Sequence, residues 1–301
     1  MTSKMNEISK NILPSGLYII STPIGNLSDI TFRAIDTLKS VDLIACEDTR
    51  VSKVLLSHYG IDTPTTSVHN YNEADRIDFI AQKISSGLSV ALISDAGTPL
   101  ISDPGYKLSS ALRSAGFYVT SVPGPSSPIN ALALAGFPTN RFTFIGFVPS
   151  KQSERKTFFD SVGDNLGTVI FFETANRLID TLTFLCDVFP NRQIAVAREM
   201  TKVYEEVLID TPKNLLSHFS TTPPRGEFVC LIHPPVEQSA SYNENILSST
   251  NTNITREKVV DMLNFLLQYM SLKDASNFIS NTFEISKKIV YNLGLELKQN
   301  K

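Results

Sequence analysis

Short polar side chains gather directly behind the apolar run 90–93, in the stretch SDAGTPLISDPG that covers residues 94–105. Two Asp, two Pro and two Gly lie within these twelve residues. In an open α/β sheet, the loops at the carboxyl ends of the strands present backbone N–H groups and short side chains to a ligand. Gly and Pro are also the commonest turn residues, so a tight turn into a helix near Tyr106 is the alternative interpretation.

Two groups of charged residues also follow apolar runs. Glu47, Asp48 and Arg50 come directly after the run 41–46, where they could orient a polar substrate or assist removal of a proton. A structural ion pair that caps the next helix is the alternative. The second group follows the run 194–197 and has a solvated strand edge as its alternative. Its charged members are Arg198, Glu199, Lys202, Glu205 and Glu206.

The first loop of the chain, TPIGNL at 22–27, argues against two common nucleotide sites. It has one Gly and lacks both the G-x-G-x-x-G pattern and the Walker Lys-Ser/Thr pair, which disfavours NAD binding and P-loop hydrolysis. Together with the loops at 47–50 and 94–99 it should line one crevice, closed by PGPSS at 123–127. Without a phosphate cradle, that crevice suits a ligand held by backbone groups, such as a nucleoside with an amino-acid tail.

The elements that position these loops alternate regularly from residue 16. Short apolar strands between amphipathic helices predict a parallel sheet. The expected strands are 17–21, 41–46, 65–68, 90–93 and 118–122. The expected helices are 29–40, with Asp29 as its N-cap, 52–59, 73–86 and 106–115.

The second half has more strands and less regular crossovers, which predicts a mixed sheet in a separate domain. After a helix that follows the PGPSS turn, its expected strands are 142–147, 168–172, 194–197, 203–209 and 228–232. A Ser/Asn/Thr-rich stretch is then typical of a linker, and three short helices follow it. The predicted divisions are a flexible tail at 1–15, α/β domains at 16–123 and 124–235, a linker at 236–254 and a helical segment at 255–301.

Composition limits the class of protein. The chain has 301 residues, 42% of them apolar, and a formal net charge of −3, which argues against a protein that coats nucleic acid electrostatically. The helical segment after 255 is slightly basic by contrast, which a solvated face explains as well as phosphate contact does. Three widely spaced cysteines indicate reduced core thiols, and no metal-ligand spacing is present. Without a signal peptide or a membrane-length apolar run, we expect a cytoplasmic protein.

Several stretches, taken in order, carry a resemblance to a known family. TPIGNL, EDTR, SDAGTPLISDPG, PGPSSPINALALAGFP, AREMTKVYEE and RGEF are similar to the ribosomal RNA small subunit methyltransferase I family, in the tetrapyrrole-methylase-like superfamily. The resemblance implies two α/β domains, a homodimer, no metal, and S-adenosylmethionine bound in the cleft between the domains. The cofactor-binding residues that it implies are Pro23, Gly25, Asp95, Ala96, Gly97, Thr98, Ser126, Ser127, Phe172 and Glu173.

The activity that the resemblance implies is 2′-O-methylation of a cytidine ribose in the decoding region of 16S rRNA, within the 30S subunit. Our catalytic hypothesis assigns the substrate side to Glu47, Asp48, Arg50, Glu199 and Lys202. Departures from the family pattern at 174–176 and 51–52 concern substrate-side contacts more than the cofactor. Methylation of a small tetrapyrrole-type molecule and a non-catalytic RNA- or ribosome-binding module are the two alternatives.

Overall fold

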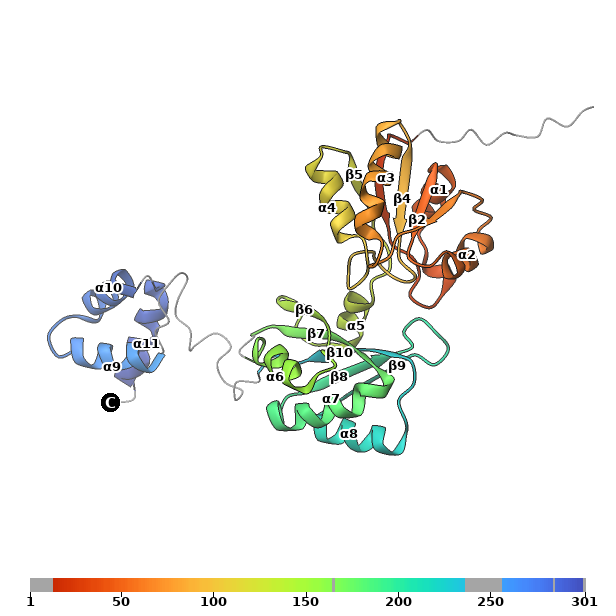
Figure 1. The fold of residues 1–301 in the computed structure, drawn as a ribbon. Coiled ribbons are helices and arrows are strands. Elements are labelled where there is room, and N and C mark those ends of the chain that lie inside the picture. The colour runs from red at the N-terminus through yellow and green to blue at the C-terminus, as the bar shows by residue number, and fades with distance from the viewer. Residues whose placement is uncertain (1–12, 164–165, 236–255, 284, 300–301) are drawn as a thin grey trace, which may run out of the picture. The chain divides into compact units, whose positions relative to one another are not determined.

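The computed structural model describes residues 13–163, 166–235, 256–283 and 285–299. It divides into two compact units, residues 1–235 and 236–301 (Figure 1). The predicted linker, and all but the last three residues of the predicted N-terminal tail, lie outside the described residues. No helix in the described ranges combines the length and the apolar character needed to cross a membrane.

The first sheet is fully parallel, in the order β3-β2-β4-β1-β5. Helices α1 and α2 pack on one face and α3 and α4 on the other, each face with its own apolar core (Figure 1). This confirms the predicted α/β fold of the first half. The strands are β1 (Gly16–Ile20), β2 (Leu43–Cys46), β3 (Thr65–Ser67), β4 (Ser89–Ile93) and β5 (Val119–Val122), and the helices are α1 (Phe32–Ser40), α2 (Thr49–His58), α3 (Glu73–Ser85) and α4 (Tyr106–Ser114).

Two helix starts differ from the sequence prediction. Asp29 lies in a 3-10 turn, Leu27–Asp29, and Thr31 is the N-cap of α1, its hydroxyl accepting the Ala34 N–H at 3.1 Å. The prediction of Asp29 as N-cap was wrong because Ile30 is extended and buried in the core, so that the helix begins after it. Helix α2 begins three residues before the predicted start, capped by Asp48.

A buried carboxylate anchors the start of α4. Glu73, only 4% exposed, accepts the backbone N–H of Leu108 at 2.9 Å and so satisfies a donor that the helix leaves unpaired. Gly105 precedes the helix with φ +118°, and a Cβ there would lie 2.6 Å from Leu92 Cδ2. The end of the SDAGTPLISDPG stretch is therefore fixed on both sides.

We expect Glu73→Ala to lower the free energy of unfolding by about 2 kcal/mol, since the Leu108 N–H loses its buried partner. Asp75→Ala is the matched control, because Asp75 lies exposed in the same first turn of α3, and it should change stability by less than about 0.5 kcal/mol. Urea unfolding followed by circular dichroism measures both variants. Equal losses would contradict the capping role.

The second sheet is mixed, in the order β6-β7-β10-β8-β9, with β6 and β7 parallel and the remaining pairs antiparallel. Helix α5 packs on one face, and α6, α7 and α8 on the other. The mixed sheet confirms the prediction for this half. Its elements are α5 (Ser127–Ala135), β6 (Phe142–Phe147), α6 (Gln152–Asp160), β7 (Thr168–Thr174), α7 (Ala175–Val188), β8 (Ile194–Arg198), β9 (Glu206–Asp210), α8 (Pro212–Thr221) and β10 (Glu227–Ile232).

Strand β9 starts three residues later than predicted. Residues 203–205 belong to a turn in which Glu205 N–H bonds to the Lys202 carbonyl, and Thr201 has a φ of +67°. Val203 and Tyr204 are 92% and 77% exposed, so their β-favouring side chains have no sheet to pack on. The prediction of strand from 203 was wrong for that reason.

The C-terminal unit has three helices in its described residues, as the periodicity predicts. They are α9 (Arg256–Leu266), α10 (Leu272–Phe283) and α11 (Lys287–Gln299). Each contributes to a shared apolar core, which includes Val259, Ala275 and Val290 at 0% exposure. The unit therefore has an interior of its own.

Candidate functional site

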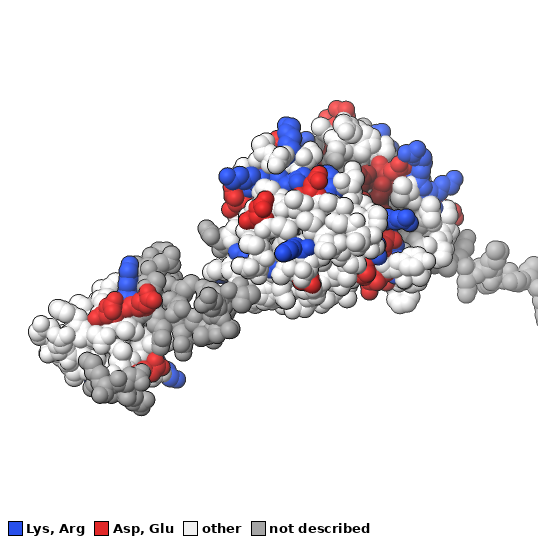
Figure 2. All heavy atoms as spheres, turned by 90° about the horizontal axis from the view of Figure 1, so that it is seen from below, with Lys and Arg blue, Asp and Glu red and all other residues white. Residues whose placement is uncertain are grey.

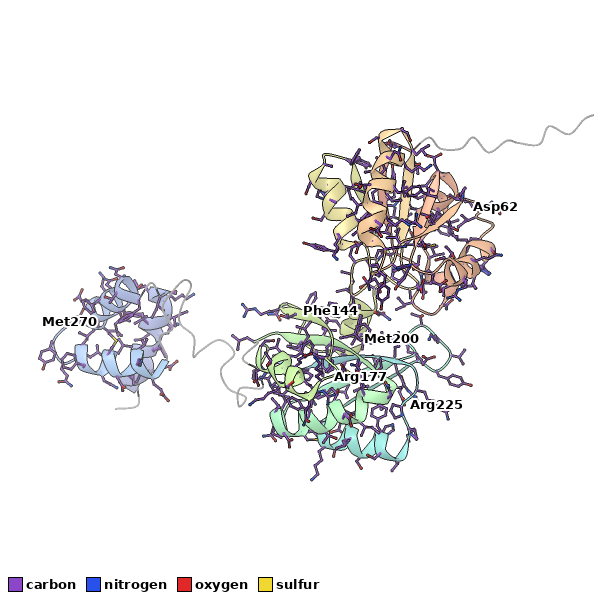
Figure 3. All side chains as sticks on the ribbon, in the orientation of Figure 1. Asp62, Phe144, Arg177, Met200, Arg225 and Met270 are labelled. Carbon is purple, nitrogen blue, oxygen red and sulfur yellow. The ribbon has the colours of Figure 1, made fainter. Side chains whose placement is uncertain are left out.

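Both sheets contribute loops to one cavity of about 400 Å³ in the 1–235 unit. Its apolar walls include Phe147, Phe172 and Met200, and Figure 3 labels Met200 at the end of β8 on the α5 side of the second sheet. The lining residues are Ile24, Asp95, Ala96, Gly97, Thr98, Ile101, Asp103, Ser126, Ser127, Pro128, Phe147, Phe172, Glu199, Met200, Lys202, Gly226, Glu227, Phe228 and Val229.

The loops after β1 and β4 are joined at the cavity by an antiparallel backbone bridge. Thr22 N–H donates to the Gly97 carbonyl at 2.8 Å, and Gly97 N–H donates back at 3.0 Å. The Thr98 hydroxyl donates to the Pro125 carbonyl at 2.9 Å, which ties the PGPSS turn to the same loop. Gly97 is left-handed, with φ +76°, which favours glycine at this position. Three of the four predicted loops, TPIGNL, SDAGTP and PGPSS, therefore meet.

Seven of the ten residues predicted to bind the cofactor line the cavity, and three do not. Pro23 is buried beside the bridge. Gly25 packs against the loop after β8, where a Cβ would lie 2.8 Å from Lys202 Cγ and 2.9 Å from the Met200 carbonyl oxygen. The seven are Asp95, Ala96, Gly97, Thr98, Ser126, Ser127 and Phe172.

The third exception, Glu173, is fully buried on the other side of β7 from the cavity-lining Phe172. Its carboxylate pairs with Arg177 at 2.9 Å and accepts the Thr181 hydroxyl at 2.6 Å and the Thr174 N–H at 2.8 Å. These partners fix the end of β7 and the start of α7. The geometry gives Glu173 a structural role in the described residues, and its predicted contact with a cofactor stays a prediction.

Two of the five predicted catalytic residues line the cavity. Lys202 Nζ and Glu199 Oε1 form an ion pair at 3.1 Å. Glu199 has a left-handed backbone with φ +48°, uncommon for a residue with a side chain and of the kind often found at functional sites. Gly226 approaches so closely that a Cβ there would lie 2.7 Å from Glu199 Oε1. The loop after β8 is therefore packed tightly on two sides.

The other three, Glu47, Asp48 and Arg50, do not line the cavity. They adjoin its floor, which is the loop 95–98 joined to Thr22. Asp48 N–H donates to Asp95 Oδ1 at 3.1 Å. Hydrogen bonds from Arg50 hold the pKa of Asp48 down to about 2, and Arg50 itself is 88% exposed. Burial, and then the charge of Asp95, raises the pKa of Glu47. The structure thus shows the capping ion pair that was the alternative interpretation, next to the cavity.

Two acidic residues of the cavity, Asp103 and Glu227, were not among the predicted site residues. Asp103 is the second Asp of SDAGTPLISDPG, and Glu227 lies in the RGEF stretch, so each belonged to a motif without receiving a role. Burial raises the pKa of Asp103 to about 6, reinforced by Glu47, Asp95 and Glu227. The spacing of residues in the sequence does not reveal that the loop carrying Asp103 reaches the second sheet.

Comparison with known proteins identifies relatives over most of the chain. Residues 16–216 match the Tetrapyrrole (Corrin/Porphyrin) Methylases family. The chain is 47% identical to the ribosomal RNA small subunit methyltransferase I of Rickettsia prowazekii, covering 75% of this chain and 81% of that one. It is 40% identical to the protein of the same name from Haemophilus influenzae, covering 93% and 96%.

Solved structures with this fold include the uroporphyrin-III-C-methyltransferase of Thermus thermophilus, with a TM-score of 0.53 at 16% identity, covering 73% of this chain and 94% of that one. A diphthine synthase superposes with a TM-score of 0.56 at 12% identity, covering 72% and 89%. At these identities the likeness shows the fold alone. With the family match and the relatives above, the chain belongs to the Tetrapyrrole (Corrin/Porphyrin) Methylases and, among them, to the ribosomal RNA small subunit methyltransferase I family.

Proposed function

We propose that the protein methylates the ribose 2′-hydroxyl of a cytidine in the decoding region of 16S rRNA, with S-adenosylmethionine as the methyl donor. The observation that carries this proposal is family membership at 36–47% identity, in several relatives over more than nine-tenths of both chains. A small-subunit ribosomal RNA substrate follows from the name those relatives share. The ribose position, the nucleotide, the 30S particle as substrate and a cytoplasmic location are the finer parts of the proposal.

The cavity fits the donor in size and charge. Pockets for ligands of this kind measure roughly 300–1,000 Å³, and this one measures about 400 Å³. S-adenosylmethionine has an apolar adenine, polar ends and a cationic sulfonium. Aromatic and aliphatic walls suit the base, while Asp95–Thr98, Ser126 and Ser127 would hold the polar groups. Four carboxylates against one cation favour a positively charged ligand; they are Asp95, Asp103, Glu199 and Glu227, against Lys202.

When bound, S-adenosylmethionine supplies a methyl group that is already electrophilic, so the main task of the chain is to align and activate the acceptor. A ribose hydroxyl is a weak nucleophile at neutral pH and needs its developing negative charge stabilised. Lys202 lies at the cavity with Glu199 holding its ammonium group. We assign Lys202 to that charge. Arg50, exposed beside the cavity floor, is assigned to an RNA phosphate.

Lys202→Ala should lower single-turnover methylation of 30S subunits by about 100-fold, the cost typical of losing one group that stabilises charge in the transition state. Arg50→Ala should mainly raise KM and reduce the salt dependence of binding, because a phosphate contact is lost. Labelled cofactor and purified 30S subunits provide the assay. Lys151→Ala, which removes a surface lysine outside the cavity lining, is the control. Wild-type rates in both test variants would contradict these roles.

The formal net charge of −3 argues for a local RNA contact rather than a surface that coats RNA electrostatically. On the face of the molecule in Figure 2, basic and acidic side chains are interspersed among large neutral areas. We therefore expect specificity to come from the cavity and its rim. Methyl transfer to a precorrin-type substrate instead of 30S subunits would favour the small-molecule alternative, and calorimetry without any cofactor binding would favour a non-catalytic module.

The proposal includes a homodimer. Light scattering at micromolar concentration should give about twice the mass of one chain, which is 33.2 kDa. A mass of one chain at micromolar concentration would contradict the homodimer and leave the proposed methylation unaffected.

A further inference from the structure

Asp103 is held in the cavity by an unusual backbone on its N-terminal side. Leu100 and Ser102 have φ values of +76° and +68°, although neither is glycine. Such conformations cost free energy and persist where the surrounding structure imposes them, most often at functional sites. Gly146 of β6 is a direct neighbour of this segment, because a Cβ there would lie 3.6 Å from Ser102 Oγ. The first half of the unit thus presents Asp103 against the second half.

The groups that face Asp103 are mostly other carboxylates. Glu47 follows β2, Asp95 follows β4, and Glu227 opens β10, and each disfavours the charged form of Asp103. The Ser94 hydroxyl is the neighbour that favours the charged form. With burial as the largest cause, the pKa of Asp103 rises to about 6. Below neutral pH, Asp103 can therefore accept and release a proton within the working range of a general base.

We propose that Asp103 is the general base that takes the proton from the ribose 2′-hydroxyl. This rests on the proposed function. The ribose oxygen bonds to the methyl carbon while the carbon–sulfur bond breaks, its electron pair remaining on sulfur. The O–H bond breaks as the proton passes to a carboxylate oxygen of Asp103. The positive charge of the sulfonium is thereby replaced by a proton on the carboxylate, and the step balances.

The other carboxylates are less suited to this role. Glu199 is committed to Lys202 at 3.1 Å, and Asp95 accepts the Asp48 N–H at 3.1 Å and is exposed. Glu227 is exposed as well, and Glu47 is outside the cavity lining. Asp103 combines a place in the cavity, partial burial and the absence of an ion-pair partner among the described residues. It is thus the cavity acid best placed to receive a proton.

The pH dependence follows from the sign of the charge change. A base must be deprotonated to act, so kcat/KM should rise tenfold per pH unit below about pH 6, the pKa of Asp103, and level off above it. Binding of a cationic donor favours the charged carboxylate, so the inflection in kcat should lie at lower pH than that in kcat/KM. Titration of Glu47 and Asp95 will broaden the lower limb.

The test compares Asp103→Asn, Asp103→Glu and Asp95→Asn in the full-length protein, with 30S subunits and labelled S-adenosylmethionine under single-turnover conditions. We expect Asp103→Asn to lower the rate by about 100- to 10,000-fold, while the cofactor Kd from calorimetry stays within about threefold. The pH profile of its residual rate should lose the inflection near pH 6 and instead rise steadily with pH. Asp103→Glu should retain an acid limb at a reduced rate. Asp95→Asn should act mainly on the cofactor Kd.

Two results would overturn the assignment of Asp103 as the general base and leave the proposed function standing. One is an Asp103→Asn enzyme that keeps the wild-type rate and acid limb. The other is a loss of cofactor binding as large as the loss of rate, which would make Asp103 a cofactor-binding residue. Wild-type protein that binds cofactor but leaves 30S subunits unmethylated would instead overturn the proposed function, and Asp103 as its base with it.

Discussion

Glu173→Ala should lower the free energy of unfolding of the 1–235 unit by about 3 kcal/mol, because removing one member of a buried ion pair leaves its partner uncompensated. Glu173 is fully buried, and Arg177, 23% exposed, loses its partner at 2.9 Å. The Thr181 hydroxyl loses its acceptor as well. At roughly 2–4 °C per kcal/mol for a unit of this size, the thermal midpoint should fall by about 6–12 °C.

A surface pair offers the matched control. Lys151 and Glu154 lie 3.0 Å apart with both side chains mostly exposed, so Glu154→Ala should cost less than about 1 kcal/mol. Glu173→Gln should fall between the two, since it keeps an acceptor for Thr181 but loses the charge. Differential scanning calorimetry tests the structural role of Glu173, and cofactor titration tests its predicted role in cofactor binding. Unchanged stability with weakened cofactor binding would support the cofactor contact that the family resemblance implies.

Gly25→Ala should reduce kcat/KM for 30S subunits by about 100-fold, the size of effect expected when catalytic groups shift by about 1 Å. A Cβ at this position would lie 2.9 Å from the Met200 carbonyl oxygen, and backbone cannot move aside as a side-chain end can. The loop that carries Glu199 and Lys202 must therefore retreat. Because Gly25 has no positive φ, the substitution adds crowding without backbone strain.

Gly163→Ala is the control for this second prediction. The nearest atom to a Cβ at Gly163 is the Asp160 carbonyl oxygen at 3.6 Å, an ordinary contact, and Gly163 also lacks a positive φ. We expect unchanged activity there. Activity retained in Gly25→Ala, with Gly163→Ala equally active, would show that the loop after β8 tolerates displacement.

The elements of the fold were predictable where local patterns dominate. The runs that become β1, β2 and β4 are apolar and short, and their helices show clear periodicity. Helix starts were harder, since Asp29 and Thr31 are both good N-caps and the burial of Ile30 decides between them. Helices α6, α7 and α8 did not appear in the sequence prediction, which followed the strands of the second half.

The residues of the candidate site also divide into those that local patterns place and those that tertiary contacts place. Asp95–Thr98, Ser126 and Ser127 lie in loops that parallel-strand topology brings together, so motif and fold class suffice to place them in the cavity. Asp103 and Glu227 required knowledge of how the second sheet meets the first. In that sheet β10 lies between β7 and β8, an antiparallel order that nothing in the local sequence specifies. Contacts between the two halves decide which acids enter the cavity.

The bridge between Thr22 and Gly97 makes the cavity floor a small piece of sheet rather than two independent loops. Folding already fixes those backbone torsions, at roughly 1–2 kcal/mol of conformational entropy per residue. A molecule that binds to the floor therefore meets a preorganised surface. Lys202, which lines the cavity, leads into a turn whose tip, Val203 and Tyr204, lies outside the cavity lining and is 92% and 77% exposed. We therefore expect cofactor binding to be a fast, rigid-body step. RNA binding should follow it and carry the entropic cost of ordering the turn at 203–204.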